Sequence, residues 1–132
     1  MEYRELMRVA EQAREHAYAP YSHFAVGAAL LTCDGRVFTG CNIENAAYSP
    51  TNCAERTAFF KAVSEGVRAF AAIAITGGPA GQPPREDCTP CGVCRQVMAE
   101  FCDGDFVVLL GNSEQLRQST LAELLPQSFS LT

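Results

Sequence analysis

The chain has 132 residues, a length that suits one domain with its own hydrophobic core, and we expect a single domain over residues 1–132. Its formal net charge of −5 disfavours nucleic acid as a partner and better suits a small neutral or cationic substrate. No apolar run reaches the roughly 18 residues that cross a membrane, and the polar start is unlike a signal peptide. We therefore expect a cytoplasmic protein without a membrane partner.

The first predicted elements are a helix and a hairpin. Apolar residues recur at helical spacing over residues 3–18, which predicts an amphipathic helix that ends before Pro20. Two strand-like runs, residues 26–32 and 36–41, flank Asp34-Gly35. An Asp-Gly pair in this position indicates an antiparallel hairpin with a type I′ turn, which needs positive φ at both central residues.

Two further helices are predicted to begin at a Ser-Pro or Thr-Pro pair, because Ser and Thr are preferred N-caps and Pro suits the first helical position. Ser49-Pro50 opens the first of these helices, which ends at Gly66. Thr89-Pro90 opens the second, which runs to about Phe101. Their first turns carry cysteines: Cys53 in one helix, and Cys91 and Cys94 in the other.

The remaining strands complete a sheet. Residues 70–75 and 106–110 are apolar runs typical of buried strands, and residues 116–120 can pair back before a short helical turn. Residues 77–87 have the composition of a mobile surface loop. The order of helices and strands predicts an α/β fold, with three layers (α/β/α) around a mixed five-stranded sheet.

Seven cysteines is a high and odd count. In a reducing compartment such usage indicates metal binding or catalysis rather than a disulfide framework. For Cys33, Cys41 and Cys102 we expect the behaviour of buried small hydrophobes. Cys88 precedes Cys91 by three residues and is a rival candidate for a metal ligand.

The three cysteines at helix starts are candidate zinc ligands. Unpaired backbone N–H groups and the helix dipole favour thiolates there. Cys53, Cys91 and Cys94 supply three ligands, and a catalytic zinc keeps its fourth position for water. Glu55 is placed to act as a base toward that water. Arg56 could donate hydrogen bonds to the sulfurs and offset the excess negative charge of three thiolates, although a solvent-facing role is the alternative.

Two other interpretations of the cysteines remain open at this point. A Cys-x-x-Cys pair alone is compatible with redox chemistry. A structural zinc site would need a fourth protein ligand, for which the candidates are Cys88, Cys41 and His23.

Four segments together resemble the zinc-dependent cytidine deaminases of the small homotetrameric class. The central motifs are Cys53-Ala54-Glu55-Arg56 and the segment from Pro90 to Gln96, PCGVCRQ. Residues 20–29 resemble the family's early motif, residues 42–48 its nucleoside-binding segment, and residues 124–129 its C-terminal motif. The resemblance covers nearly the whole chain, and it departs from the family in the 77–88 loop, which is long and ends in the extra Cys88.

The resemblance implies a catalytic centre with one Zn²⁺ per subunit. Cys53, Cys91 and Cys94 would hold the ion. Glu55 would move protons between water, N3 of the cytosine ring and the departing ammonia. Arg56 would support the thiolates from beside the ligand set.

The resemblance also implies substrate contacts. Asn42 and Glu44 would bind the ribose hydroxyl, and Phe24 would pack on the base. The Ala54 backbone N–H and the Thr89 carbonyl would meet O2 of the pyrimidine and the leaving amine. For Phe24, core packing is the default alternative from sequence alone.

Tyr48 and Phe129 would reach the active site of a neighbouring subunit, so the resemblance implies a homotetramer whose pockets are completed across subunits. Core packing is again the alternative for Phe129. The expected reaction is hydrolytic deamination of cytidine and 2′-deoxycytidine to uridine and 2′-deoxyuridine, a step of pyrimidine salvage. The alternatives are a deaminase of another small aminopyrimidine nucleoside and a non-catalytic zinc-binding module.

Overall fold

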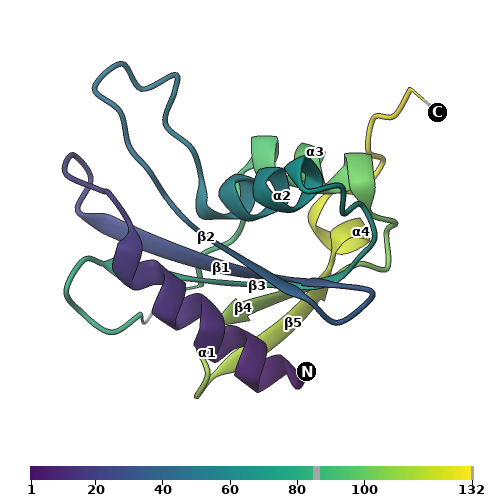
Figure 1. Cartoon of the computed structure of the whole chain (residues 1–132), viewed down its shortest axis with the longest axis horizontal. Coiled ribbons are helices and arrows are strands. Elements are labelled where there is room, and N and C mark those ends of the chain that lie inside the picture. Colours follow the sequence, from purple (N-terminus) through teal and green to yellow (C-terminus); the bar gives the residue numbers. More distant parts are fainter. Residues whose placement is uncertain (85–86, 132) are drawn as a thin grey trace.

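Five strands form one mixed sheet in the computed structural model, which describes residues 1–84 and 87–131 (Figure 1). The strands lie in the spatial order β2-β1-β3-β4-β5, with β3 and β4 parallel and the other neighbours antiparallel. This arrangement confirms the predicted mixed five-stranded sheet. The strands are β1 (Phe24–Thr32), β2 (Val37–Cys41), β3 (Phe70–Pro79), β4 (Val107–Gly111) and β5 (Leu116–Thr120).

Helices cover both faces of the sheet, which confirms the predicted three layers. In Figure 1, α1 crosses one face, and α2 and α3 lie on the other, with the short α4 beside α3. No helix in the described ranges is both long enough and apolar enough to traverse a bilayer. The helical elements are α1 (Tyr3–Ala13), the 3₁₀ turn η1 (Arg14–His16), α2 (Ala54–Ser64), α3 (Gly92–Phe101) and α4 (Leu121–Leu124).

Each face of the sheet has its own core. Under α2 and α3 the core is aromatic, because Phe59 of α2 packs on Phe70, Phe101 and Phe106 with ring centroids 5.0 to 6.3 Å apart. Under α1 the core is made of aliphatic and small side chains. The larger core fixes α2 and α3 relative to the sheet, and these are the two helices whose starts carry the candidate ligands.

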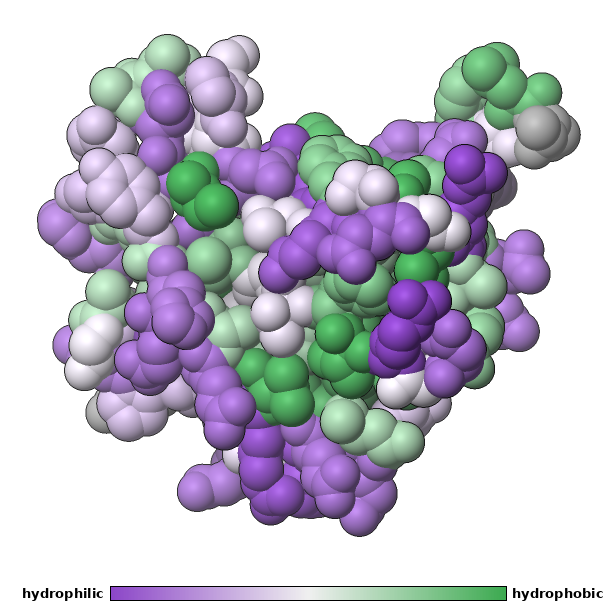
Figure 2. Space-filling view, in the orientation of Figure 1, coloured by the Kyte–Doolittle hydropathy of each residue, from purple (hydrophilic) through white to green (hydrophobic). Residues whose placement is uncertain are grey.

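Two projections rise from the same side of the molecule (Figures 1 and 2). One is the segment between β2 and α2, and the other is the C-terminal segment after α4. Tyr48 in the first is 78% exposed and Phe129 in the second is 69% exposed. Core packing, the alternative for Phe129, is therefore excluded within this chain.

Several local predictions were wrong. The hairpin between β1 and β2 forms, but positive φ falls on Gly35 (89°) and not on Asp34, so the turn is not type I′. The first helix ends at Ala13 and continues as the η1 turn instead of reaching residue 18. Cys33 is exposed in the β1–β2 connection, contrary to its expected burial, while Cys41 and Cys102 are half-buried.

The two helices whose starts carry the candidate ligands begin later than predicted. Cys53 and Cys91 are themselves the N-cap residues, both with extended backbone, so Ser49-Pro50 and Thr89-Pro90 lie before the helices. The predicted 77–87 loop is also shorter, because β3 continues to Pro79, where it pairs with Phe24. Residues 85–86 of that loop lie outside the described part of the chain.

Candidate active site

Three sulfur atoms gather where α2 and α3 begin. The Sγ atoms of Cys53, Cys91 and Cys94 all lie within 4.8 Å of one another, with Cys53 to Cys91 at 3.8 Å and Cys91 to Cys94 at 3.4 Å. Cys91 also caps α3, since its Sγ accepts from the backbone N–H of Cys94 at 3.5 Å. Three soft donors this close together fit a metal such as zinc. Cys88 is not part of this group, so the described chain does not support it as a rival ligand.

The start of α2 is held against the sheet by a glycine. A Cβ on Gly40 of β2 would lie 2.3 Å from the Ala54 carbonyl oxygen and 2.7 Å from the Ala58 nitrogen. Only a residue without a side chain lets the strand and helix approach this closely. The contact fixes the first turn of α2, and therefore Cys53 and Glu55, relative to β2.

The cysteines differ in their electrostatics. A hydrogen bond with Cys94, assisted by one from Arg56, lowers the pKa of the Cys53 thiol to about 5. The same contact with Cys53, together with burial, raises the pKa of Cys94. Of the two thiols, Cys53 therefore loses its proton more readily than Cys94, and the thiolate is the form that binds a metal.

Glu55 lies in the first turn of α2 with only 4% of its surface exposed. Burial raises the pKa of its carboxyl to about 7, and the nearby charge of Cys53 also raises it. A buried carboxyl that can hold or release a proton near neutral pH is suited to acid and base catalysis.

Arg56 faces the sulfurs, so its solvent-facing alternative is not supported. Its Nη2 donates to the Cys53 Sγ at 3.1 Å. The pKa of Arg56 is raised, first by this hydrogen bond and then by the charges of Cys53 and Cys94. Its buried Nε has no hydrogen-bond partner among the described residues.

A pocket of about 200 Å³ opens beside the sulfurs. Cys53, Ala54 and Glu55 of the α2 start line it, and so do residues from β1, from the β2–α2 segment and from the segment before α3. The pocket therefore brings a metal-binding donor set, a buried carboxyl and several polar groups together. Its other lining residues are Val26, Asn42, Glu44, Thr51, Asn52, Cys88, Thr89 and Cys91.

Comparison with known proteins assigns the family. Residues 1–110 match the model of the cytidine and deoxycytidylate deaminase zinc-binding region. The chain belongs to this deaminase family. A protein of Sporosarcina psychrophila named cytidine deaminase is 54% identical over 98% of this chain and 93% of its own length, and one of Halalkalibacterium halodurans is 55% identical over 95% and 92%. The crystal structure of a cytidine deaminase from Burkholderia pseudomallei has a TM-score of 0.88 at 49% identity, covering 98% of this chain and all of the other.

The polar residues expected to meet ribose in this deaminase-family chain already make contacts within it. The Asn42 side-chain amide makes two hydrogen bonds with the start of β1. Its Oδ1 accepts from the Val26 N–H at 2.8 Å, and its Nδ2 donates to the Phe24 carbonyl oxygen at 2.8 Å. Glu44 accepts from the backbone N–H groups of Tyr21 and Ser22 and from the Ser22 hydroxyl, and this last bond is the main cause of its lowered pKa. Both side chains line the pocket while anchoring neighbouring backbone.

Phe24 does not line the 200 Å³ pocket but lies close to its wall. A Cβ on Gly77 of β3 would be 2.9 Å from the Cys88 Sγ and 3.1 Å from the Phe24 ring. Gly77 therefore lets the ring and the thiol come together. Phe24 is half-buried at the start of β1, so it is not a fully buried core residue, and packing on a base remains a prediction.

Tyr48 and Phe129 lie apart from this pocket. Tyr48 has positive φ (60°) and lines a second pocket of about 250 Å³ with residues of the β2–α2 segment and with Tyr21 and Ser22. Phe129 is tied to α3 through its carbonyl, which accepts from the Gln96 side chain at 3.1 Å.

Sequence reasoning missed the side chains that attach the C-terminal segment. Arg95 donates to Pro90 O at 2.7 Å and to Leu124 O at 2.6 Å, so it joins the segment before α3 to α4. Arg95 and Gln96 directly follow the candidate ligand Cys94, but their place in the sequence does not indicate a contact with the C-terminal segment.

Proposed function

We propose that this chain is a zinc-dependent deaminase that hydrolyses cytidine and 2′-deoxycytidine to uridine and 2′-deoxyuridine with release of ammonia. The observation that carries the proposal is the buried carboxyl of Glu55, which lines the same pocket as Cys53 and Cys91. The family assignment and the relatives named cytidine deaminase support it.

One zinc ion per subunit would be held by Cys53, Cys91 and Cys94. When bound, it supplies Lewis-acid activation of water at neutral pH. Arg56 would draw charge from the Cys53 thiolate through their hydrogen bond, because three thiolates leave a zinc site with net negative charge. The chain's own contribution to charge balance is thus a single guanidinium beside the first ligand.

Glu55 would carry the protons. It would accept one proton from the attacking water and deliver it to N3 of the ring, then accept the remaining proton of the added hydroxyl and deliver it to the amino group that leaves as ammonia. The net reaction adds water at C4 of the base and releases the amino group as ammonia. Because Glu55 is regenerated in each cycle, one carboxyl is sufficient for the proton transfers. Its burial excludes bulk water from these transfers.

The substrate would lie between the α2 start and the strand ends. Asn42 and Glu44 would bind the ribose hydroxyl, and Phe24 would pack on the base. The Ala54 N–H and the Thr89 carbonyl would meet O2 and the amine. Since Asn42 and Glu44 also anchor β1 and residues 21–22, ribose binding and the shape of the pocket depend on the same side chains.

The deciding experiment follows the loss of cytidine absorbance with zinc-loaded protein. Glu55→Gln keeps the shape of the side chain but cannot carry the proton, so turnover should fall by about 10²–10⁴-fold while zinc content stays constant. Glu65→Gln, an exposed change after the end of α2, is the matched control and should match the wild type. Absence of turnover in the wild type, or full activity in Glu55→Gln, would contradict the proposal.

The proposal extends to a cytoplasmic homotetramer acting in pyrimidine salvage, with Tyr48 and Phe129 completing a neighbour's pocket. Support comes from the exposure of both rings on the two projections. Sedimentation should give about four times the 14.3 kDa chain mass.

Phe129→Ala should raise KM for cytidine more than Phe60→Ala, a change at an exposed phenylalanine of α2. A monomer with full activity would contradict this part.

A further inference from the structure

Arg14 is a buried charge that the proposed chemistry does not use. It begins the η1 turn after α1, and only 6% of it is exposed. A guanidinium is costly to bury unless its donors find acceptors. Ion pairs in the described ranges join Arg36 to Asp34 and Arg117 to Asp87, so within these ranges Arg14 is held by neutral groups.

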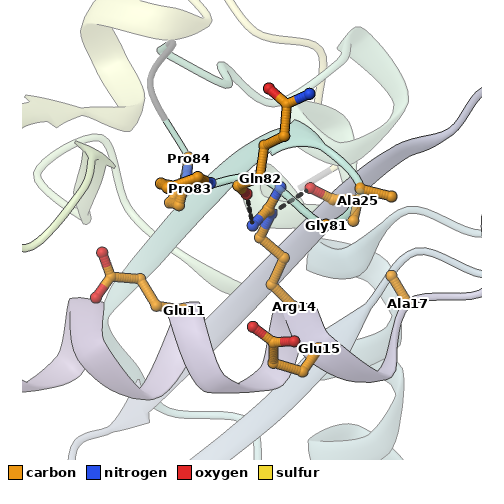
Figure 3. A pocket seen from close by; sticks show the side chains of 10 residues that line it. Glu11, Arg14, Glu15, Ala17, Ala25, Gly81, Gln82, Pro83 and Pro84 are labelled. Carbon is orange, nitrogen blue, oxygen red and sulfur yellow. Dashed lines mark hydrogen bonds between the residues drawn. The ribbon is translucent and has the colours of Figure 1, made fainter.

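Four backbone carbonyls accept hydrogen bonds from Arg14. Its Nε donates to Ala25 O at 2.8 Å and its Nη1 to Gln82 O at 2.8 Å, and Figure 3 shows the side chain reaching from the helix toward both residues. Its Nη2 donates to Gly78 O at 2.9 Å and to Pro79 O at 2.7 Å. The guanidinium therefore bridges the start of β1, the end of β3 and the loop that follows.

A glycine makes room for this bridge. A Cβ on Gly27 of β1 would lie 2.0 Å from the Ala10 carbonyl oxygen and 2.6 Å from the Arg14 nitrogen. Any larger residue would push the end of α1 and the η1 turn away from the sheet. Gly27 thus sets how close the η1 turn, and with it Arg14, lies to the ends of β1 and β3.

The backbone that Arg14 holds adjoins the wall of the proposed substrate pocket without lining it. Ala25 pairs with Gly78 in the β1–β3 register, and the adjacent Val26 lines the pocket. From the β2 side, the Asn42 amide bonds Phe24 O and Val26 N. Three consecutive residues of β1 are therefore held by two side chains, one from each side of the strand.

We propose that Arg14 is a positioning residue for nucleoside binding. By bridging carbonyls of β1 and β3 it fixes the strand ends beside Val26, which lines the pocket, and beside Phe24, which lies close to the pocket wall. None of its four hydrogen bonds goes to α2 or α3, which carry Glu55 and the cysteines. The inference rests on the proposed function, and it predicts an effect on substrate binding that is separate from metal binding and proton transfer.

The test compares kcat, KM and zinc content across variants of the zinc-loaded enzyme with cytidine. Arg14→Gln should raise KM about tenfold with kcat within about twofold of the wild type, because a displaced wall weakens binding without touching the reacting groups. Arg14→Lys keeps the charge but reaches fewer carbonyls, so its KM should be intermediate. Arg8→Gln, at an exposed arginine of α1, is the control and should match the wild type.

Chemical rescue separates positioning from folding. A cavity of about 400 Å³, lined by Glu11, Glu15 and residues 80–84 among others, lies beside Arg14 (Figure 3). In Arg14→Ala, added methylguanidinium should enter from this cavity and lower KM, while the wild type should not respond.

Three outcomes overturn the inference. An unchanged KM in Arg14→Gln overturns it while the proposed function stands. A Lys variant as impaired as the Gln variant, with no rescue by methylguanidinium, assigns the effect to folding and overturns it as well. A wild type without cytidine turnover overturns the proposed function and, with it, this inference.

Discussion

The two helix starts that carry the cysteines are built alike but lie in different surroundings. Each has a cysteine as N-cap with extended backbone. The α2 start is fixed against Gly40 of β2, and its next two residues, Ala54 and Glu55, are buried. At the α3 start, Cys91 and the residues that follow it, Gly92 and Val93, are exposed.

Because of this difference, the two helix starts contribute different groups to the site. The α2 start supplies one sulfur, the proposed proton carrier Glu55 and the guanidinium that faces the sulfurs, on backbone packed closely against Gly40. The α3 start supplies two sulfurs, brought together because Cys91 caps the N–H of Cys94. Metal binding should therefore depend on both helix starts, and the proton chemistry on α2 alone.

The largest effect should come from removing the buried sulfur of α3. Cys94→Ala leaves two thiols, too few for a stable zinc site, so bound zinc and cytidine turnover should both be lost. Elemental analysis of the purified protein and the absorbance assay measure these two losses. Cys33→Ala, at the exposed cysteine of the β1–β2 connection, should retain both. A full zinc complement in Cys94→Ala would show that the donor set has been misassigned.

A smaller effect is expected from Arg56→Gln on α2. Loss of the hydrogen bond to the Cys53 Sγ should lower kcat by about 10–100-fold while zinc stays bound, since partners of metal ligands tune the ion more than they hold it. Arg68→Gln, at an exposed arginine beyond α2, serves as the matched control. Wild-type kcat in Arg56→Gln would show the charge argument to be wrong.

The smallest effect is expected at Cys88, which borders the pocket but lies outside the sulfur group. Cys88→Ala should keep its zinc and change KM for cytidine by about threefold or less, because it removes one side-chain atom from a pocket wall. Zinc analysis and steady-state kinetics test this together. Loss of zinc from this variant would make Cys88 a ligand and give a four-sulfur site together with Cys53, Cys91 and Cys94.

Much of this comparison was predictable from the sequence because its signals are local. The spacing of Cys91 and Cys94, and a cysteine two residues before Glu55, indicated a ligand set and a base. The alternation of apolar runs and turn residues indicated the strands and the layer order. The structure brings the three sulfurs within 4.8 Å of one another, and Cys53, Cys91 and Glu55 line one pocket.

The rest could not be predicted because it depends on contacts across the sheet. Ser49-Pro50 resembles a helix start, yet the helix begins at Ala54, where Gly40 lets α2 reach the strand. Residues 77–79 have loop composition, but pairing with β1 makes them strand. Arg14 looks like a surface residue of an amphipathic helix, and only the carbonyls of Ala25, Gly78, Pro79 and Gln82 explain its burial.

The contact between Gly40 and α2 has a consequence for how this enzyme could diversify. Ile43 and Asn52 exchange two backbone hydrogen bonds of 2.9 Å, which close the base of the projection between β2 and α2. Residues 44–51 are thus a module with both ends fixed, inserted just before a helix that Gly40 holds in place. If Glu44 binds ribose and Tyr48 reaches a neighbouring subunit, as proposed above, changes within this module would alter sugar preference or subunit pairing without displacing Cys53. On that proposal, exchange of residues 44–51 between deaminases would change the pocket lining at Glu44 and Thr51 while leaving the sulfurs and Glu55 in place.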